Sequence, residues 1–125
     1  QQKKPDDYVI ATGKTYSVKY FIDKAAKYLK LRLKWKGKGI NTKAYDEKGN
    51  CIVECDKKYF RPTEVDILLG NANKAKKILK WKPRLSINKS IKLTVEWYKS
   101  ILDDRQNYEK VTENQIKEFL NVKSL

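Results

Sequence analysis

The chain has 125 residues, of which 40% are hydrophobic and 35% charged, a balance that predicts one folded domain with a modest core. Its net charge is +14, but 25 of the 29 basic residues are lysines, spread along the whole chain. Scattered lysine favours a solvated surface, and a basic nucleic-acid-binding protein stays open as an alternative. No apolar run approaches the roughly 20 residues of a membrane span, and no signal peptide opens the chain.

The chain begins with Gln1 and contains no methionine, so we expect it to be a fragment of a longer protein. Its two cysteines, Cys51 and Cys55, would lie roughly 13 Å apart on an extended segment, too far for a disulfide. The chain has no histidine and therefore lacks the ligand set of a zinc site. Two free thiols favour a reducing, cytoplasmic location.

The first elements that the sequence predicts are a strand and a helix. Residues 7–12 include the β-forming run Tyr-Val-Ile and predict a short buried strand. Gly13 turns the chain, and Ser17 is a suitable N-cap for a helix over residues 18–30. A strand, a turn and a helix make half of an α/β unit, so we expect this parallel strand to lack its partners within the chain.

Further along, alternating or β-forming residues predict two strands, over 31–37 and 51–55, separated by a turn at 46–50. Capping residues and apolar periodicity then predict four helices. The expected helices cover residues 62–69, 71–81, 87–102 and 112–120. Asn71 or Asn73 caps the second, Ser86 caps the third, and a capping box opens the fourth at Thr112.

Two short motifs resemble catalytic or phosphate-binding patterns without meeting their requirements. The Gly-Lys-Thr run that starts at Gly13 lacks the glycine that a phosphate-binding loop needs five positions earlier, where Tyr8 stands. Tyr20 and Lys24 have the Tyr-x-x-x-Lys spacing of short-chain dehydrogenases, but eight tyrosines among so many lysines produce such pairs by chance. The absence of histidine excludes a Ser-His-Asp arrangement.

The pair Arg61 and Glu64 is the strongest candidate for ligand binding. Pro62 and Glu64 suit the first turn of a helix, whereas a cation is disfavoured at that positive end. An anion held by Arg61 together with free backbone N–H groups would resolve this conflict. From the residues alone, a simple helix start and an anion site both stay open.

Two stretches, "DYVIATGKTYSVKYFIDKA" and "YFRPTEVDILLGNANKAKKILKWKPRLS", resemble the C-terminal part of the GDP-mannose 4,6-dehydratase family. The resemblance runs in order from about Gln1 to Leu102. It implies that residues 1–102 are the C-terminal nucleotide-sugar-binding portion, and that residues 103–125 are an extension with a short helix. The implied fold class is α/β, the substrate-binding part of an extended Rossmann-type short-chain dehydrogenase/reductase whose N-terminal NADP-binding domain is absent.

The resemblance also implies an activity and a role for individual residues. Members of this family are NADP-dependent lyases of GDP-fucose biosynthesis that convert GDP-mannose to GDP-4-keto-6-deoxymannose, and a homo-oligomer is expected for the full-length protein. The family pattern places Arg61 on the diphosphate and Glu64 on the ribose, with Tyr59 and Phe60 packed beneath them. The catalytic residues and the NADP site belong to the missing part, so this chain alone is expected to be inactive. A stand-alone or degenerate nucleotide-sugar-binding module is the alternative.

Two departures from the family pattern stand out. The loop that usually reads Gly-Glu-Thr-His reads Gly-Lys-Thr-Tyr from Gly13 to Tyr16, and the usual Gly-Asp before the short helix is Gly70-Asn71. Neither departure changes Arg61 or Glu64.

Overall fold

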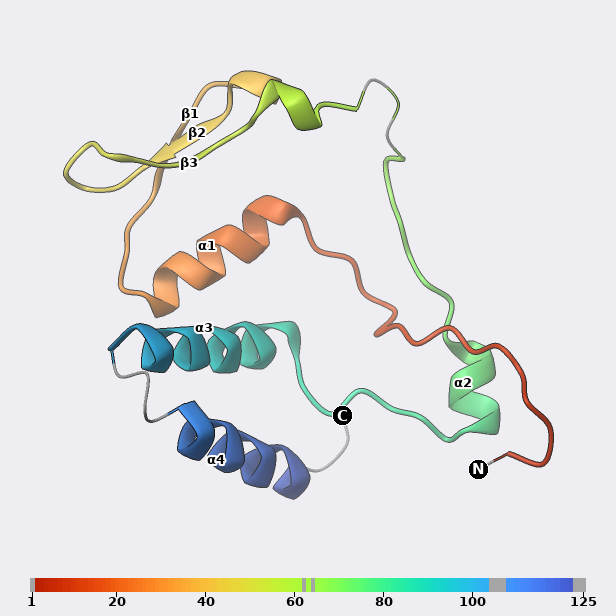
Figure 1. Ribbon diagram of the computed structural model, residues 1–125. Coiled ribbons are helices and arrows are strands. Elements are labelled where there is room, and N and C mark those ends of the chain that lie inside the picture. Colours follow the sequence, from red (N-terminus) through yellow and green to blue (C-terminus); the bar gives the residue numbers. More distant parts are fainter. Residues whose placement is uncertain (1, 62, 64, 104–107, 123–125) are drawn as a thin grey trace.

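The computed structural model describes residues 2–61, 63, 65–103 and 108–122 of the chain (Figure 1). Helices and strands both occur, so the α/β class is confirmed at this level. The elements in chain order are α1 (Val18–Tyr28), β1 (Lys34–Lys36), β2 (Lys43–Tyr45), β3 (Cys51–Glu54), α2 (Asn73–Ile78), α3 (Ile87–Asp103) and α4 (Tyr108–Asn121), with short 3-10 helices at Gly39–Asn41 and Lys57–Tyr59.

The three strands, α1, α3 and α4 form a stack, and α2 stands apart from it (Figure 1). The sheet lies over α1, which packs against α3, and α3 packs in turn against α4. Long extended connections lead to α2 from both sides. None of the helices in the described residues is long and apolar enough to cross a membrane.

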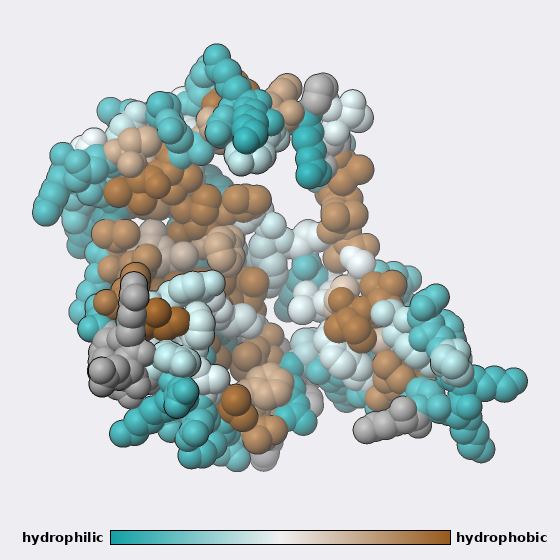
Figure 2. All heavy atoms as spheres, in the orientation of Figure 1, coloured by the Kyte–Doolittle hydropathy of each residue, from teal (hydrophilic) through white to brown (hydrophobic). Residues whose placement is uncertain are grey.

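Among the residues that the structure describes, the buried ones are few and mostly small. They are Ala26, Ala44, Ala72, Ala75, Ile91 and Leu93. Alanines on α1 and β2 allow close approach of neighbouring elements, but they bury little apolar area. Many large apolar side chains therefore remain exposed, and Figure 2 shows such atoms on several parts of this face of the molecule.

Helix α1 confirms the predicted cap and nearly the predicted length. The Ser17 hydroxyl accepts a hydrogen bond from the Tyr20 amide at 3.0 Å. The helix ends at Tyr28, two residues earlier than expected, because Lys30 adopts a φ of 60°. The Leu31 amide then donates to the Ala26 carbonyl at 2.8 Å, the closing bond of a Schellman motif.

The sheet is antiparallel, in the order β1-β2-β3. Strands β1 and β3 confirm the two strands predicted near these positions, within narrower bounds. Strand β2 was not predicted, because three residues with lysine and alanine give no alternating signal. It is held by pairing: Ala44 lies opposite both Trp35 and Val53. The Trp35 indole donates to Asp23 at 2.7 Å, which connects the sheet to α1.

Two predicted elements are wrong in the described residues. Residues 7–12 form no strand, because no neighbouring strand in the described chain pairs with them. In the range 62–69, the described residues 63 and 65–69 are not helical. A helix of this length needs packing to be stable in water, and Leu68 is 82% exposed.

The remaining helices confirm their predicted positions, with shifted ends. Helix α2 is shorter than predicted, and Asn71 rather than Asn73 accepts a bond at its start, from the Asn73 amide at 3.0 Å. Helix α3 begins after Ser86, whose hydroxyl accepts from the Lys89 amide at 3.3 Å. Helix α4 is already helical from Tyr108, so the capping box does not open it.

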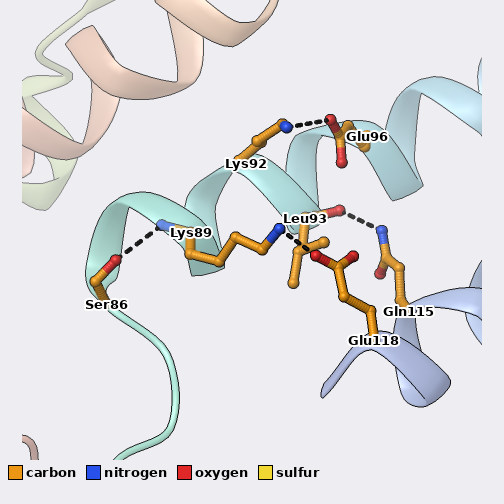
Figure 3. A network of polar contacts seen from close by, with 7 residues as sticks. All are labelled: Ser86, Lys89, Lys92, Leu93, Glu96, Gln115 and Glu118. Carbon is orange, nitrogen blue, oxygen red and sulfur yellow. Dashed lines mark hydrogen bonds and ion pairs between the residues drawn. The ribbon is translucent and has the colours of Figure 1, made fainter. Parts of the chain in front are cut away.

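Polar contacts attach α4 to α3 (Figure 3). The Gln115 amide donates to the Leu93 carbonyl at 2.8 Å, and Lys89 pairs with Glu118. The bond to Glu118 raises the pKa of Lys89. Gln115, which was expected to help open α4, therefore makes a tertiary contact instead. The predicted boundary between a nucleotide-sugar-binding portion, residues 1–102, and an extension, residues 103–125, stays a prediction.

Candidate functional site

The candidate site lies on the connection from the sheet to α2. After β3, Asp56 opens the 3-10 helix Lys57–Tyr59, and its carboxylate accepts from the Lys58 amide at 2.9 Å. The Phe60 amide closes this turn on the Lys57 carbonyl at 3.1 Å. Arg61 follows directly and is exposed, so a defined turn leads the chain to it.

The structure corrects the reason that made Arg61 a candidate. We expected this cation at the positive end of a helix over residues 62–69, where an anion would be needed. The described residues of that range are not helical, so they provide no helix end to create this conflict. Pro62 and Glu64 lie outside the described residues, and the pairing of Arg61 with Glu64 stays a prediction.

Two lysines next to Arg61 were not among the predicted site residues. Lys57 and Lys58 are exposed on the same short turn, so three cations fall within five residues. Like charges this close create a positive potential that attracts anions. The signal in the sequence was the run Lys-Lys before the two aromatic residues, which the even spread of lysine elsewhere obscured.

Tyr59 and Phe60 do not pack beneath the site, contrary to expectation. Both side chains are exposed, and the Lys58 ammonium lies 5.6 Å from the centre of the Tyr59 ring. These rings are therefore accessible, and an exposed aromatic face beside cations is suited to stacking on a flat, charged ligand.

Two acidic side chains that precede the site serve structural contacts. Glu54, at the end of β3, pairs with Lys43 on β2 at 2.9 Å, and this bond raises the pKa of Lys43. Asp56 caps the turn before Arg61. The described part of this segment thus offers cations and aromatic rings, which can bind and orient an anion, rather than a pair of carboxylates for acid–base chemistry.

The loop after residues 7–12 lies near the far end of the same connection. Gly13, with a φ of 78°, and residues 69–73 line a cavity of about 360 Å³ together with Lys76. On its other side, Thr12, Lys14 and Tyr16 face the start of α3 across a cavity of about 320 Å³. The loop that departs from the family pattern is therefore a packing junction between the N-terminal segment, α2 and α3.

These observations define a small α/β unit that carries an exposed basic and aromatic segment. A sequence model of the family described as "GDP-mannose 4,6 dehydratase" matches residues 1–94. The chain therefore belongs to the GDP-mannose 4,6 dehydratase family, which confirms the resemblance read from the sequence. The matched range includes Arg61 and Glu64.

Curated relatives agree with this assignment. The GDP-mannose 4,6 dehydratase of Dictyostelium discoideum is 50% identical over 93 residues, which are 74% of this chain and 26% of that protein. The enzyme of Sinorhizobium fredii (strain HH103) is 46% identical over 70% of this chain and 25% of its own length. The human protein is 41% identical over 74% of this chain and 25% of its own length. The chain thus spans about a quarter of the length of the curated relatives that it matches.

Proposed function

We propose that this chain is the C-terminal, GDP-sugar-binding portion of an enzyme that converts GDP-mannose to GDP-4-keto-6-deoxymannose. The observation that carries the proposal is the family match over residues 1–94, which includes the basic segment. The curated relatives bear the name of this activity, and a stand-alone binding module or a nucleic-acid-binding protein is not favoured by these comparisons.

Within this function, Arg61 holds the diphosphate of the GDP-sugar and Glu64 accepts hydrogen bonds from the ribose hydroxyls. A planar guanidinium can bind two phosphate oxygens at once, and a carboxylate can accept from two adjacent hydroxyls. The exposure of Arg61 and the neighbouring Lys57 and Lys58 support an anion at this position. The exposed Tyr59 and Phe60 rings provide apolar surface beside it.

The residues of this chain do not fit an NADP site. A dinucleotide fingerprint needs three closely spaced glycines between a strand and a helix, and Gly13 is the only glycine before α1. Hydride exchange with NADP therefore belongs to the rest of the protein, in a Rossmann domain outside these 125 residues. The chain alone binds and orients the GDP-sugar without converting it, and the complete protein works as a homo-oligomer in the cytoplasm.

The role of Arg61 is testable in a full-length chimera in which this chain replaces the matching quarter of the Dictyostelium relative. Arg61→Ala should weaken GDP binding by about 2–4 kcal/mol in calorimetry, because it removes one side of a charged contact. Arg32→Ala is the matched control, since Arg32 is exposed and pairs with Glu47 at 3.6 Å in the hairpin. Equal affinities for the two variants would contradict the diphosphate role.

The alternative reading makes a different prediction for the unmodified chain. A nucleic-acid-binding protein would bind DNA at nanomolar concentrations, with a steep loss of affinity as salt rises and with no competition by GDP. We expect instead that this chain binds DNA only weakly and that the chimera binds GDP measurably.

A further inference from the structure

A continuous series of backbone contacts leads the chain from β3 to Arg61. The Cys55 amide donates to the Thr42 carbonyl at 3.2 Å, which continues the pairing of β2 and β3 by one residue beyond the strand. The 3-10 helix Lys57–Tyr59 follows, and Figure 1 shows it between β3 and the long connection that descends to α2. Arg61 comes directly after the residue whose amide closes this turn, so the turn sets the place from which its side chain extends.

The side chain of Asp56 fixes the start of this turn. Its carboxylate accepts a hydrogen bond from the Lys58 amide at 2.9 Å, and its carbonyl accepts one from the Tyr59 amide at 3.1 Å. The carboxylate thereby satisfies a backbone donor that the turn itself leaves open. A single 3-10 turn has few bonds of its own, so its order depends strongly on this cap.

The turn orders the cations of the candidate site as well as its backbone. The residue whose amide the cap holds, Lys58, also places its ammonium 5.6 Å from the centre of the Tyr59 ring. After Arg61 the sequence continues with a proline, and a residue before proline is restricted to extended backbone. The backbone of Arg61 is therefore restrained by the turn on one side and by its neighbour in the sequence on the other.

The charge of Asp56 opposes the anion that this arrangement would bind. Between Cys55 and Thr63 the sequence contains three cations and one acid, which is Asp56. A carboxylate close to a bound anion repels it. Asparagine caps such a turn about as well as aspartate and carries no charge. The cap of Asp56 and its charge thus have opposite effects on anion binding.

We propose that Asp56 is a positioning residue for the GDP-sugar site. Through the turn it holds Arg61 where the diphosphate binds, and through its charge it limits how tightly that anion is held. Limited affinity does not slow an enzyme, because binding substrate and transition state more tightly by the same amount leaves the rate of turnover unchanged. The inference rests on the proposed function, since it takes the diphosphate as the ligand of Arg61.

Two uncharged substitutions separate the cap from the charge in the full-length chimera. By calorimetry, Asp56→Asn should bind GDP about twofold more tightly than the unmodified chimera, because it keeps the cap and removes the repulsion. Asp56→Ala should bind GDP about fivefold more weakly than Asp56→Asn, because both lack the charge and alanine also lacks the cap. Higher salt should reduce the gain in Asp56→Asn and leave the difference between the two variants in place.

Asp46→Ala is the matched control for the loss of a cap. The Asp46 carboxylate accepts from the Lys48 amide at 2.9 Å, the same contact two residues along, in the turn between β2 and β3. It also accepts from the Asn50 amide at 2.8 Å, so Asp46→Ala should lower the melting temperature at least as much as Asp56→Ala. Its affinity for GDP should equal that of the unmodified chimera. An equal loss of affinity in Asp46→Ala and Asp56→Ala would overturn the proposal, since general destabilisation would then explain both.

The order of the turn is measured without any ligand, by NMR of this chain. The amides of Lys58 and Phe60 should lose protection from hydrogen exchange in Asp56→Ala and keep it in Asp56→Asn. Unchanged protection in Asp56→Ala would overturn the proposal, and so would equal affinities of the alanine and asparagine chimeras for GDP. An unmodified chimera that does not bind GDP would refute the proposed function and this inference with it. Binding by the unmodified chimera with equal affinities of the two variants would refute this inference alone.

Discussion

The contact of the Trp97 indole with Thr112 gives the sharpest test of how α4 is held on α3. The indole N–H of Trp97 donates to the Thr112 hydroxyl at 2.8 Å in a partly buried position. The same hydroxyl donates to the Tyr108 carbonyl at 2.7 Å, within its own helix. Replacing Thr112 by valine keeps the shape of the side chain, removes both bonds and leaves the indole N–H without its acceptor.

A second threonine separates these two effects. Thr94 on α3 donates to the Ser90 carbonyl at 2.9 Å, the same contact with the preceding turn that Thr112 makes. Thr94→Val therefore removes that local bond alone, and the change in helix propensity is the same in both variants. The difference between the two variants is the indole bond, which contributes about 1 kcal/mol to the free energy of unfolding.

Urea denaturation followed by circular dichroism measures this difference. We expect Thr112→Val to lower the free energy of unfolding by about 1 kcal/mol more than Thr94→Val. In a Trp97→Phe background, where the donor is gone, the two valine variants should cost the same. Equal costs in the unmodified background, or an extra cost of Thr112→Val that persists beside Phe, would refute the role of this bond.

Two further predictions concern the hairpin. Gly37→Ala should destabilise the chain by at least about 2 kcal/mol more than Gly49→Ala. Both glycines have a positive φ, but only at Gly37 would an added Cβ meet a backbone oxygen, that of Asn41, at 2.1 Å. Thermal unfolding compares them, and equal melting temperatures would contradict the clash. The Asn50 side chain holds the pKa of Asp46 below its ordinary value of 3.8, so this contact stabilises the fold above that pH and is lost as pH falls through the lowered pKa. The NMR signal of the Asn50 side-chain amide should shift as Asp46 titrates, and this pH dependence should disappear in Asp46→Asn. An unchanged pH dependence in that variant would show that another group is responsible.

The sequence was most informative where a structural signal and its partner are a few residues apart. Ser17 and Ser86 accept bonds from the amides three positions later, so the starts of α1 and α3 could be predicted from local chemistry. The Thr112 capping box has the same local pattern, but its hydroxyl and the Gln115 amide contact α3 instead. Only knowledge of the tertiary neighbour distinguishes these cases.

The candidate site shows the same limit more strongly. The residue types of Arg61 and Glu64 indicated an anion, but the physical reason depended on a helix that the described residues do not form. The family resemblance, and not the periodicity of the segment, therefore carries the assignment of these two residues. The run Lys57-Lys58 was visible in the sequence, but its position on the turn that precedes Arg61 is what distinguishes it from the other lysines.

The two failed predictions, at residues 7–12 and 62–69, have one cause. Residues 7–12 were predicted as a buried strand without partners, and residues 62–69 as a helix with an apolar side to bury; in this chain neither finds a surface to cover it. A strand or a short helix gains its stability from neighbours, so a local signal gives no element where the described residues supply none. The exposure of these apolar side chains and the absence of the two predicted elements therefore have the same cause.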